Sequence, residues 1–247
     1  MRPRTFALIV ILLGSALALL TAEILVRYLA PVPVINPIQG PTTLHEPDPE
    51  LGWRSKEGRS VWPGRGSDAG RDIVMTFWGD GLRATAARRE PGRPQIVLVG
   101  CSITQGWAVT DEETFAWRLQ AAFPNFEVLN LGTGGYGTYQ SLLALERYLA
   151  RAPTNPVLVV YGFIQYHEGR NVAAADRLHA VRQTSDAGRV LVPFATLAPD
   201  GTLVRNEPEA YPRWPFDGVL ASVRFLENRY ATFRTRTRAA QGRAVGD

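Results

Sequence analysis

Hydrophobic residues form two different patterns along the chain, separated by a segment that shows neither. Residues 5–22 are an uncharged apolar run, whereas from Gln95 onward short apolar runs alternate with segments whose apolar residues recur every three to four positions. The run is long enough for a helix that spans a bilayer, and the alternation predicts buried strands separated by amphipathic helices. Residues 31–72, in between, are rich in proline and glycine, which favours an irregular strap.

The strands expected in the alternating part are short and strongly apolar. They are IVLVG (96–100), FEVLNLG (126–132) and NPVLVVYGFI (155–164). Helices are expected at residues 111–123 and 138–152. Strands this apolar should be covered on both faces, and their alternation with helices implies right-handed crossovers. The predicted fold class is therefore α/β, a three-layer α/β/α sandwich with a parallel sheet.

Three parts of the chain follow from these patterns. Residues 1–30 are expected to form an N-terminal anchor, residues 31–92 the strap with a short β preamble, and residues 93–247 the core domain. Within the preamble, residues 72–85 predict a strand closed by a Gly-Asp-Gly turn. A hairpin and a basic helix are expected after residue 180, and the core is predicted to be incomplete at its C-terminal end.

Charges around the apolar run predict the orientation of the anchor. Arg2 and Arg4 precede the run, and no basic residue lies between Arg27 and Arg54. This asymmetry places the N-terminus in the cytoplasm and the main domain of a single-pass membrane protein on the periplasmic or extracellular side. A cleaved signal peptide, with residues 20–22 as the processing site, is the alternative. The length of the run and its amphipathic continuation favour an uncleaved anchor.

The remaining composition limits the possible functions. With 45% hydrophobic and 20% charged residues, the 247-residue chain suits one globular domain plus an extension. Cys101 is the single cysteine, so an oxidising compartment brings no internal disulfide. No cluster of cysteines and histidines has zinc-ligand spacing, and we expect neither a metal nor another cofactor.

Basic residues are concentrated near the C-terminal end. The net charge is +4, and Lys56 is the only lysine. The arginines of this end are Arg224, Arg229, Arg234, Arg236, Arg238 and Arg243. Such a stretch can bind nucleic acid, but an exported domain rarely meets it. A solvated helix face or a patch against anionic lipid is the preferred interpretation, and no nucleic-acid partner is expected.

The unusual residues gather in the three loops that follow the expected strands. These loops are residues 100–109, 130–140 and 162–171. Ligands of open parallel sheets bind at the carboxyl ends of the strands, so the loops should meet at one site. The first reads G-C-S-I-T-Q-G, in which Thr104 excludes the G-x-S-x-G elbow of the α/β hydrolases. The glycines around Ser102 permit a sharp exit from the strand, so its N–H can help to stabilise an oxyanion and its hydroxyl can attack an ester.

The first two loops contain recognisable sequence blocks. They read VGCSITQGWAV followed by DEETF, and then NLGTGGYGTYQ, and they resemble the SGNH/GDSL hydrolase family over residues 46–171. The lead-in, DPELGWRSKEG and GDGLRAT, is similar to that of membrane-anchored relatives. The resemblance implies that Ser102 is the nucleophile and that the N–H groups of Ser102 and Gly135 stabilise the oxyanion. The alternatives are a serine that only caps a turn and a glycine needed only for its backbone conformation.

The sequence departs from the family pattern at two places. Cys101 stands where the family has aspartate, which removes a charge next to the nucleophile; strand alternation points the thiol away from Ser102, so a buried packing role is expected. The third block lacks the family's asparagine. Gln165 is its nearest chemical equivalent as an oxyanion donor, with Tyr166 and His167 as competing donors. His167 is also a candidate base or substrate contact, the alternative being a loop histidine bonded to backbone.

The family's general base, in a late Asp-x-x-His block, has no clear counterpart. Asp176 and His179 fit the pattern, but their helix is expected to start near Asn171, so His179 would lie about 12 Å along its axis, away from the strand ends. His45 lies in the strap and would have to fold back to reach the site, which nothing in the sequence requires. A fragment of a longer enzyme, a non-catalytic module and an unfamiliar base are the remaining interpretations.

The predicted activity is ester hydrolysis through an acyl-serine intermediate on Ser102, with an acylated lipid or glycan as substrate. An O-acyltransferase would use the same serine and oxyanion site, with a sugar hydroxyl in place of water. A catalytically inactive binding module is the other alternative.

Overall fold

The computed structural model describes most of the chain. The described residues are 3–32, 44–64, 69–152, 156–182, 190–198 and 200–244. For a few helical residues only the backbone is described, namely 179, 180, 182 and 238–244.

The elements alternate between strands and helices in the middle of the chain. The strands are β1 (His45–Asp48), β2 (Gly52–Ser55), β3 (Gly58–Pro63), β4 (Asp72–Phe77), β5 (Gln95–Gly100), β6 (Glu127–Asn130), β7 (Leu158–Gly162), β8 (Val192–Leu197) and β9 (Leu203–Glu209). The helices are α1 (Pro3–Leu29), α2 (Ser102–Gln105), α3 (Phe115–Ala122), α4 (Thr138–Arg151), α5 (His167–Asn171), α6 (Ala175–Arg182) and α7 (Ala221–Ala244), with 3-10 turns η2 (Gly79–Gly81) and η3 (Asp111–Glu113).

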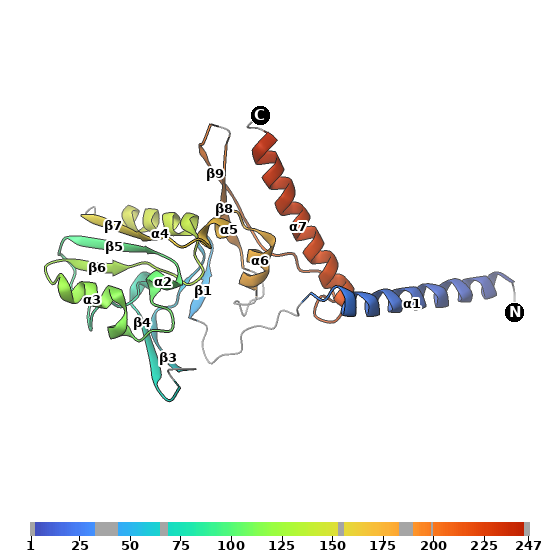
Figure 1. Cartoon of the computed structure of the whole chain (residues 1–247), viewed down its shortest axis with the longest axis horizontal. Helices are drawn as coiled ribbons and strands as arrows, with labels where there is room; N and C mark the ends of the chain where they lie inside the picture. The colour runs from blue at the N-terminus through green and yellow to red at the C-terminus, as the bar shows by residue number, and fades with distance from the viewer. Residues whose placement is uncertain are drawn as a thin grey trace.

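A parallel sheet in the order β6–β5–β7 forms the centre of the domain (Figure 1). Ile96 of β5 lies opposite Val128 of β6 and Leu158 of β7, so the three strands run in register. Their carboxyl ends therefore meet at the same edge of the sheet. The mixed α/β fold and its parallel sheet, both predicted from the strand–helix alternation, are confirmed.

Alternate residues of β5 face different helices. Val97 and Val99 lie in one apolar cluster with Leu145 of α4, whereas Ile96 and Leu98 lie in another with Ala116 of α3. This alternation follows from the two-residue period of a strand. Figure 1 shows α4 on one side of the sheet and α3 on the other. A complete three-layer sandwich stays a prediction, because β7 is less covered than β5 and β6.

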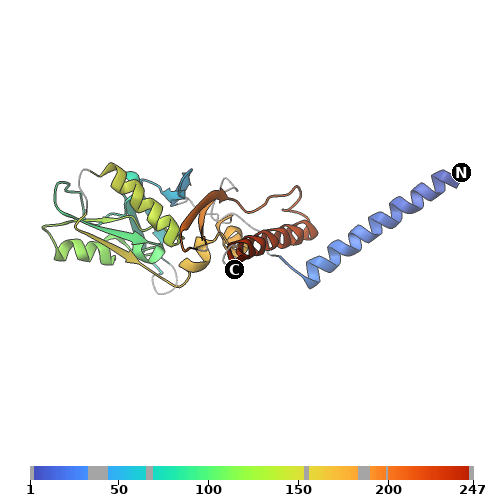
Figure 2. The same cartoon turned by 90° about the horizontal axis from the view of Figure 1, so that it is seen from above.

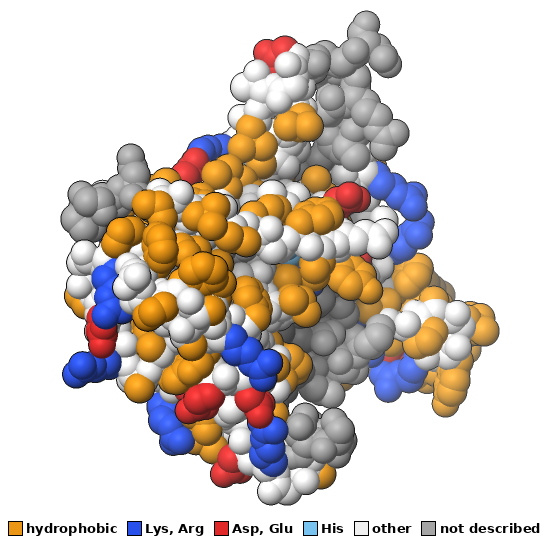
Figure 3. Space-filling model, turned by 60° about the vertical axis from the view of Figure 1, so that its left-hand side comes forward, with side chains coloured by type: hydrophobic (Ala, Val, Ile, Leu, Met, Phe, Trp, Pro, Cys, Tyr) orange, Lys and Arg blue, Asp and Glu red, His pale blue; other side chains and the backbone are white. Residues whose placement is uncertain are grey.

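The prediction that the third strand is covered on both faces is wrong. The apolar side chains of β7 are 36–51% exposed, although every residue of β5 and β6 is buried. Within the described residues, no strand pairs with the outer edge of β7. Hydrophobic side chains gather on the face of the molecule shown in Figure 3. An apolar run predicts a strand, but burial also requires elements that pack against it.

The segment before the core is more regular than its proline and glycine content predicts. Residues 44–63 contain β1 paired with β2 and the first strand of the β3–β4 hairpin, so the expectation of an irregular strap is wrong there; residues 33–43 lie outside the described residues. Residues 72–81 form β4 followed by the η2 turn, as predicted. Leu51 and Trp53 belong to the same apolar cluster as side chains of α4 and β8. The domain boundaries stay predictions.

The helix expected to start near Asn171 starts later, and a separate short helix precedes it. α5 ends at Asn171 and α6 begins at Ala175. Between them Ala173 has φ +46°, a left-handed conformation that interrupts a helix. The expected hairpin and basic helix are present as β8–β9 and α7.

Among the described helices, α1 is long and apolar enough to cross a membrane. None of its residues is buried. It extends away from the rest of the molecule in both views (Figures 1 and 2). An N-terminal apolar helix, as the sequence predicts, is therefore present.

Candidate active site

Ser102 is the first residue of α2 and follows β5 almost directly. Gly100 has φ +154° and Gly106, which ends α2, has φ +72°. A Cβ at Gly100 or at Gly162 of β7 would overlap the side chain of Thr104, which lies over the ends of both strands. Glycine is required at these positions for the chain to turn from strand to helix.

The Ser102 side chain is half-buried, next to the fully buried free thiol of Cys101. Trp107 N donates to Ser102 O at 2.9 Å. Gly106 N donates to Ile103 O at 3.1 Å and also to Ser102 O. Among the described residues its hydroxyl makes no hydrogen bond. The structure thus gives no turn-capping bond by Ser102, and it confirms that Cys101 is buried.

The second loop lies along the end of β5. Thr133 N donates to Gly100 O at 3.1 Å, which carries the pairing between strands into the loop. Gly132 lies so close to α2 that a Cβ there would be 2.6 Å from Gln105 N. The first and second loops therefore meet, as the position of both after parallel strands predicts.

The orientation of Gly135 is fixed from both sides. Trp53 Nε1 donates to Gly134 O at 2.8 Å. Because a peptide unit is planar and trans, this bond also sets the direction of the Gly135 N–H. Arg177 Nη2 donates to Gly135 O, and its guanidinium lies 5.3 Å from the Trp53 ring centroid. Gly135 has φ +82°, so its backbone conformation alone is a sufficient reason for glycine.

Arg177 brings α6 beside the second loop. Burial lowers the pKa of Arg177 to about 10, and the neighbouring Arg170 acts in the same direction. The sequence interpretation considered Asp176 and His179 of this helix and missed Arg177 between them. Asp176 is exposed, and the His179 side chain lies outside what the structure describes, so its proposed exclusion as the base is untested.

His45 does reach the loops, contrary to the sequence prediction. β1 pairs with β2, with His45 opposite Ser55, and this hairpin folds back onto the second loop. A Cβ at Gly134 would lie 3.2 Å from His45 Nε2 and 3.2 Å from Gln105 Oε1. Both of these atoms are buried without a hydrogen-bond partner in the described structure. Burial lowers the pKa of His45 to about 4.

His167 begins α5 and is fully buried in the third loop. Its Nδ1 lies 2.6 Å from Tyr161 Oη, and that hydroxyl donates to Thr138 Oγ1 at 2.7 Å. Burial, with the nearby Arg170, lowers the pKa of His167 to about 4. Its Nε2 is buried and has no hydrogen-bond partner among the described residues. His167 is therefore a neutral imidazole whose ring is oriented by the Tyr161 side chain. Its ring is not bonded to backbone, as a simple loop histidine would be.

Gln165 is not held in place by its surroundings. It is exposed, and no hydrogen bond of its side chain occurs among the described residues. Its neighbour Tyr166 is 75% exposed. The proposed role of Gln165 as an oxyanion donor stays a prediction.

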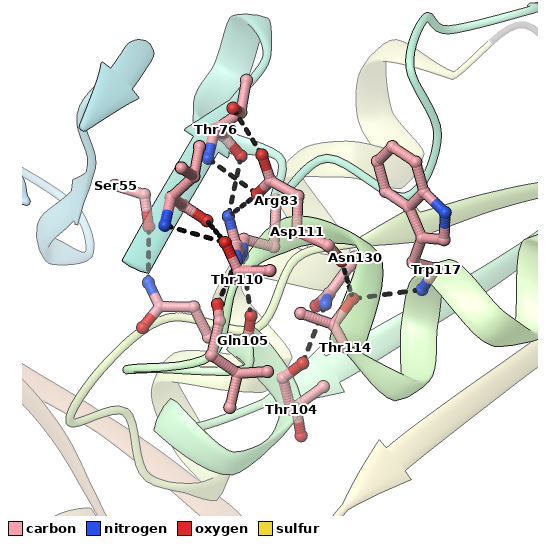
Figure 4. A network of polar contacts seen from close by, with 12 residues as sticks. Ser55, Thr76, Arg83, Thr104, Gln105, Thr110, Asp111, Thr114, Trp117 and Asn130 are labelled. Carbon is pink, nitrogen blue, oxygen red and sulfur yellow. Dashed lines mark hydrogen bonds and ion pairs between the residues drawn. The ribbon is translucent and has the colours of Figure 1, made fainter. Parts of the chain in front are cut away.

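A buried ion pair that the sequence interpretation missed lies beside the end of α2 and the loop that follows it (Figure 4). Arg83 is 0% exposed and forms an ion pair with Asp111. Its Nε donates to Gln105 O at 3.2 Å and its Nη2 to Val109 O at 2.8 Å. In addition, Asn130 Nδ2 donates to Thr104 O at 2.8 Å. The loop that contains Ser102 is therefore fixed by charged and amide side chains. An arginine between apolar residues after the η2 turn was the available signal.

The structure thus brings together the first two loops, His45 and Arg177. Among the described side chains, no histidine forms a hydrogen bond with Ser102. The described residues contain no group of three or more His, Cys, Asp or Glu that could hold a metal ion.

No protein-family model matches the chain, and no curated protein matches it. Among solved structures, the chain is similar to three structures of the esterase AlinE4, which one of them describes as an SGNH-hydrolase family esterase; the other two are mutants. Each match has 19% identity, covers 38% of this chain and 52% of the other, and has a TM-score of 0.29 to 0.30. The chain therefore matches about half the length of that esterase, and a match of this extent establishes no family.

Proposed function

We propose that this protein is a membrane-anchored SGNH-type serine esterase whose nucleophile is Ser102. The position of Ser102 carries the proposal: it is a half-buried hydroxyl on the first turn of a helix directly after the central parallel strand. Substrates of parallel sheets enter at this end of the strands. The N–H groups of a first helical turn have no partner within the helix, so they can stabilise an oxyanion.

The chemical step is acyl transfer to Ser102. Its Oγ forms a bond to the ester carbonyl carbon, the bond from that carbon to the alkoxy oxygen breaks, and the serine proton ends on the leaving alcohol. Water then cleaves the acyl-serine and restores the hydroxyl. The N–H groups of Ser102 and Gly135 would stabilise the oxyanion, and the Trp53 bond to Gly134 O supports this role because it orients the second donor.

The proton requires a base, and the chain contains three histidines. His167 has the features of a positioned base, namely one nitrogen bonded to Tyr161 and the other free of partners in the described structure. His45 and His179 are the alternatives. Gln165 would contribute a further donor if the third loop closes on substrate.

The proposed substrate is an acylated lipid or glycan. α1 would keep the domain at a membrane, on its periplasmic or extracellular side, where such esters occur. The anchor and the orientation of its charges favour a substrate at the membrane surface over a small soluble ester.

A fluorophosphonate probe tests the nucleophile, since it labels only an activated serine. We expect labelling of the full chain and its loss in Ser102→Ala, with unchanged labelling in the control Ser60→Ala, another half-buried serine. His45, His167 and His179 are then substituted one at a time. The substitution that removes the base should slow labelling at least about tenfold. Product analysis with an acceptor sugar would separate hydrolysis from O-acyl transfer. Absence of Ser102-dependent labelling would leave the binding module as the function.

A further inference from the structure

The N-terminal end of α7 is attached to α1 at the point where the apolar run stops. The carboxylate of Glu23 accepts hydrogen bonds from Ala221 N at 2.8 Å and from Ser222 N at 2.9 Å. Arg27 donates to Val219 O at 3.1 Å. A side chain of α1 thus caps the first turn of α7, which fixes the start of α7 beside the end of the membrane-spanning candidate.

α7 runs across the direction of α1 (Figures 1 and 2). In Figure 1 the α/β domain lies on one side of α7, and α1 points away on the other. If α1 crosses a bilayer, α7 lies along the bilayer surface and faces it with the side turned away from the domain.

That side of α7 carries an apolar stripe. Leu226, Tyr230 and Phe233 recur at helical spacing and are exposed, Phe233 to 66%. On the opposite side, Ala231 belongs to the main apolar cluster of the domain, and Ala221 is also buried. Within the described structure Tyr230 packs against Trp214, with ring centroids 5.9 Å apart, while Leu226 and Phe233 remain 52% and 66% exposed. An apolar helix face exposed to this extent is suited to burial against a further surface.

Arginines border this stripe. At 100° per residue, Arg229 and Arg236 lie along one border and Arg234 along the other. Arg229 and Arg236 are exposed, and no ion pair of either occurs among the described residues. The one acidic residue of α7, Glu227, is buried. Arg234 is paired with Glu209, at 2.8 Å, and lies over the Tyr230 ring. The cationic border of the stripe is therefore that of Arg229 and Arg236.

Aromatic and apolar side chains also surround the junction of the two helices. Phe216, in the loop before α7, has φ +68° and is 71% exposed. Val219 in the same loop and Tyr28 at the end of α1 are exposed as well. Such side chains are enriched where a membrane meets water.

We propose that α7 binds the surface of the bilayer that α1 crosses, with Leu226, Tyr230 and Phe233 inserted at the level of the head groups. Arg229 and Arg236 would contact the phosphates of anionic phospholipids. The combination of an apolar stripe and basic borders is the chemistry that such lipids recognise. The inference rests on the proposed anchor and is independent of the chemistry at Ser102.

The test uses the full chain in nanodiscs of phosphatidylcholine alone or with added phosphatidylglycerol. A cysteine introduced by Phe233→Cys reports burial of the stripe by its rate of reaction with a polar maleimide; the native Cys101 is buried and does not react. We expect this rate to be about tenfold lower in the anionic nanodiscs than in detergent. A cysteine from Leu197→Cys, exposed on the β8–β9 hairpin, should react equally in both.

Charge reversal separates lipid binding from simple proximity to α1. Arg229→Glu with Arg236→Glu should restore the reaction rate at position 233 in anionic nanodiscs. The matched pair Arg59→Glu with Arg118→Glu changes the net charge equally on exposed residues of β3 and α3 and should leave the protection intact.

Two results would overturn the inference. One is an equal reaction rate at position 233 in anionic nanodiscs and detergent, while the protein still co-elutes with the discs. The other is protection in detergent by an oligonucleotide with none from lipid, which would assign the arginines to nucleic acid. Failure to co-elute at all would reject the anchor and this inference together, without affecting the labelling of Ser102.

Discussion

The two flanks of β5 differ in how they are covered, and the more apolar of the two flanking strands, β7, is the exposed one. On one flank, β6 is completely buried, and the backbone of Arg83 closes its outer edge through a bridge to Asn130, with Arg83 N to Asn130 O at 2.9 Å. On the other flank, β7 is exposed and its outer edge has no described partner strand. The buried flank is thus completed by a segment outside the alternating strands and helices. Sequence pattern alone specifies strands, but their cover depends on distant segments.

The largest effect should come from the buried ion pair of Arg83, the residue whose backbone closes the buried flank. Arg83→Met leaves Asp111 buried and uncompensated, which should lower the free energy of unfolding by about 3–5 kcal/mol. Urea unfolding of the full chain in detergent, followed by tryptophan fluorescence, measures this change. The control is Arg151→Met, which removes an exposed ion pair with Asp80 and should cost below about 1 kcal/mol. Equal losses of unfolding free energy in both variants would show that the buried Arg83–Asp111 pair stabilises the fold no more than an exposed ion pair does.

A matched pair of leucines compares the two strands directly. Leu98→Ala in β5 creates a cavity at a 1% exposed position and should cost about 2–5 kcal/mol of unfolding free energy. Leu158→Ala in β7, at a 51% exposed position, should cost less than about 1 kcal/mol. The same unfolding measurement applies to both. If Leu158→Ala proved as damaging as Leu98→Ala, β7 would be covered in solution.

The smallest effect concerns two histidines, one on each flank. The pKa values of His45 and His167 are about 4 in the folded protein, against an ordinary value of 6.5. Between these values the unfolded chain binds more protons, so stability is complete above pH 6.5 and falls as the pH drops toward 4. His45→Gln and His167→Gln should each reduce this acid-induced loss, by an amount on the order of 1 kcal/mol. An unchanged pH dependence of unfolding in either variant would show that this histidine is not protected from protonation.

Much of the central sheet could be predicted because its signals are local. The apolar runs at 96–100 and 126–132 become β5 and β6, and the glycines around Ser102 predict the sharp turn. The Thr104 side chain leaves no room for a Cβ at Gly100. Parallel pairing then places the first two loops together without further information. These features depend on residues within a few positions of each other or on a general rule of topology.

The errors concern contacts between distant segments. His45 folds back because β1 pairs with β2, and a four-residue strand that contains a proline gives almost no periodic signal. Arg83 and Arg177 act through buried guanidinium groups, whereas arginine in a sequence normally indicates an exposed position. The exposure of β7 could not be predicted either, since LVVYG has the same apolar pattern whether or not another element covers it.

The outer edge of β7, where the described part of the chain supplies no partner strand, also separates two properties that usually change together. Unpaired backbone groups on an apolar edge strand can accept a strand from another chain, which promotes aggregation. Yet the apolar side chains of β7 are 36–51% exposed, so their substitution should affect solubility more than folding. A charged residue introduced on the outer edge of β7 could therefore improve the handling of the purified protein without changing the stability of the β5–β6 core.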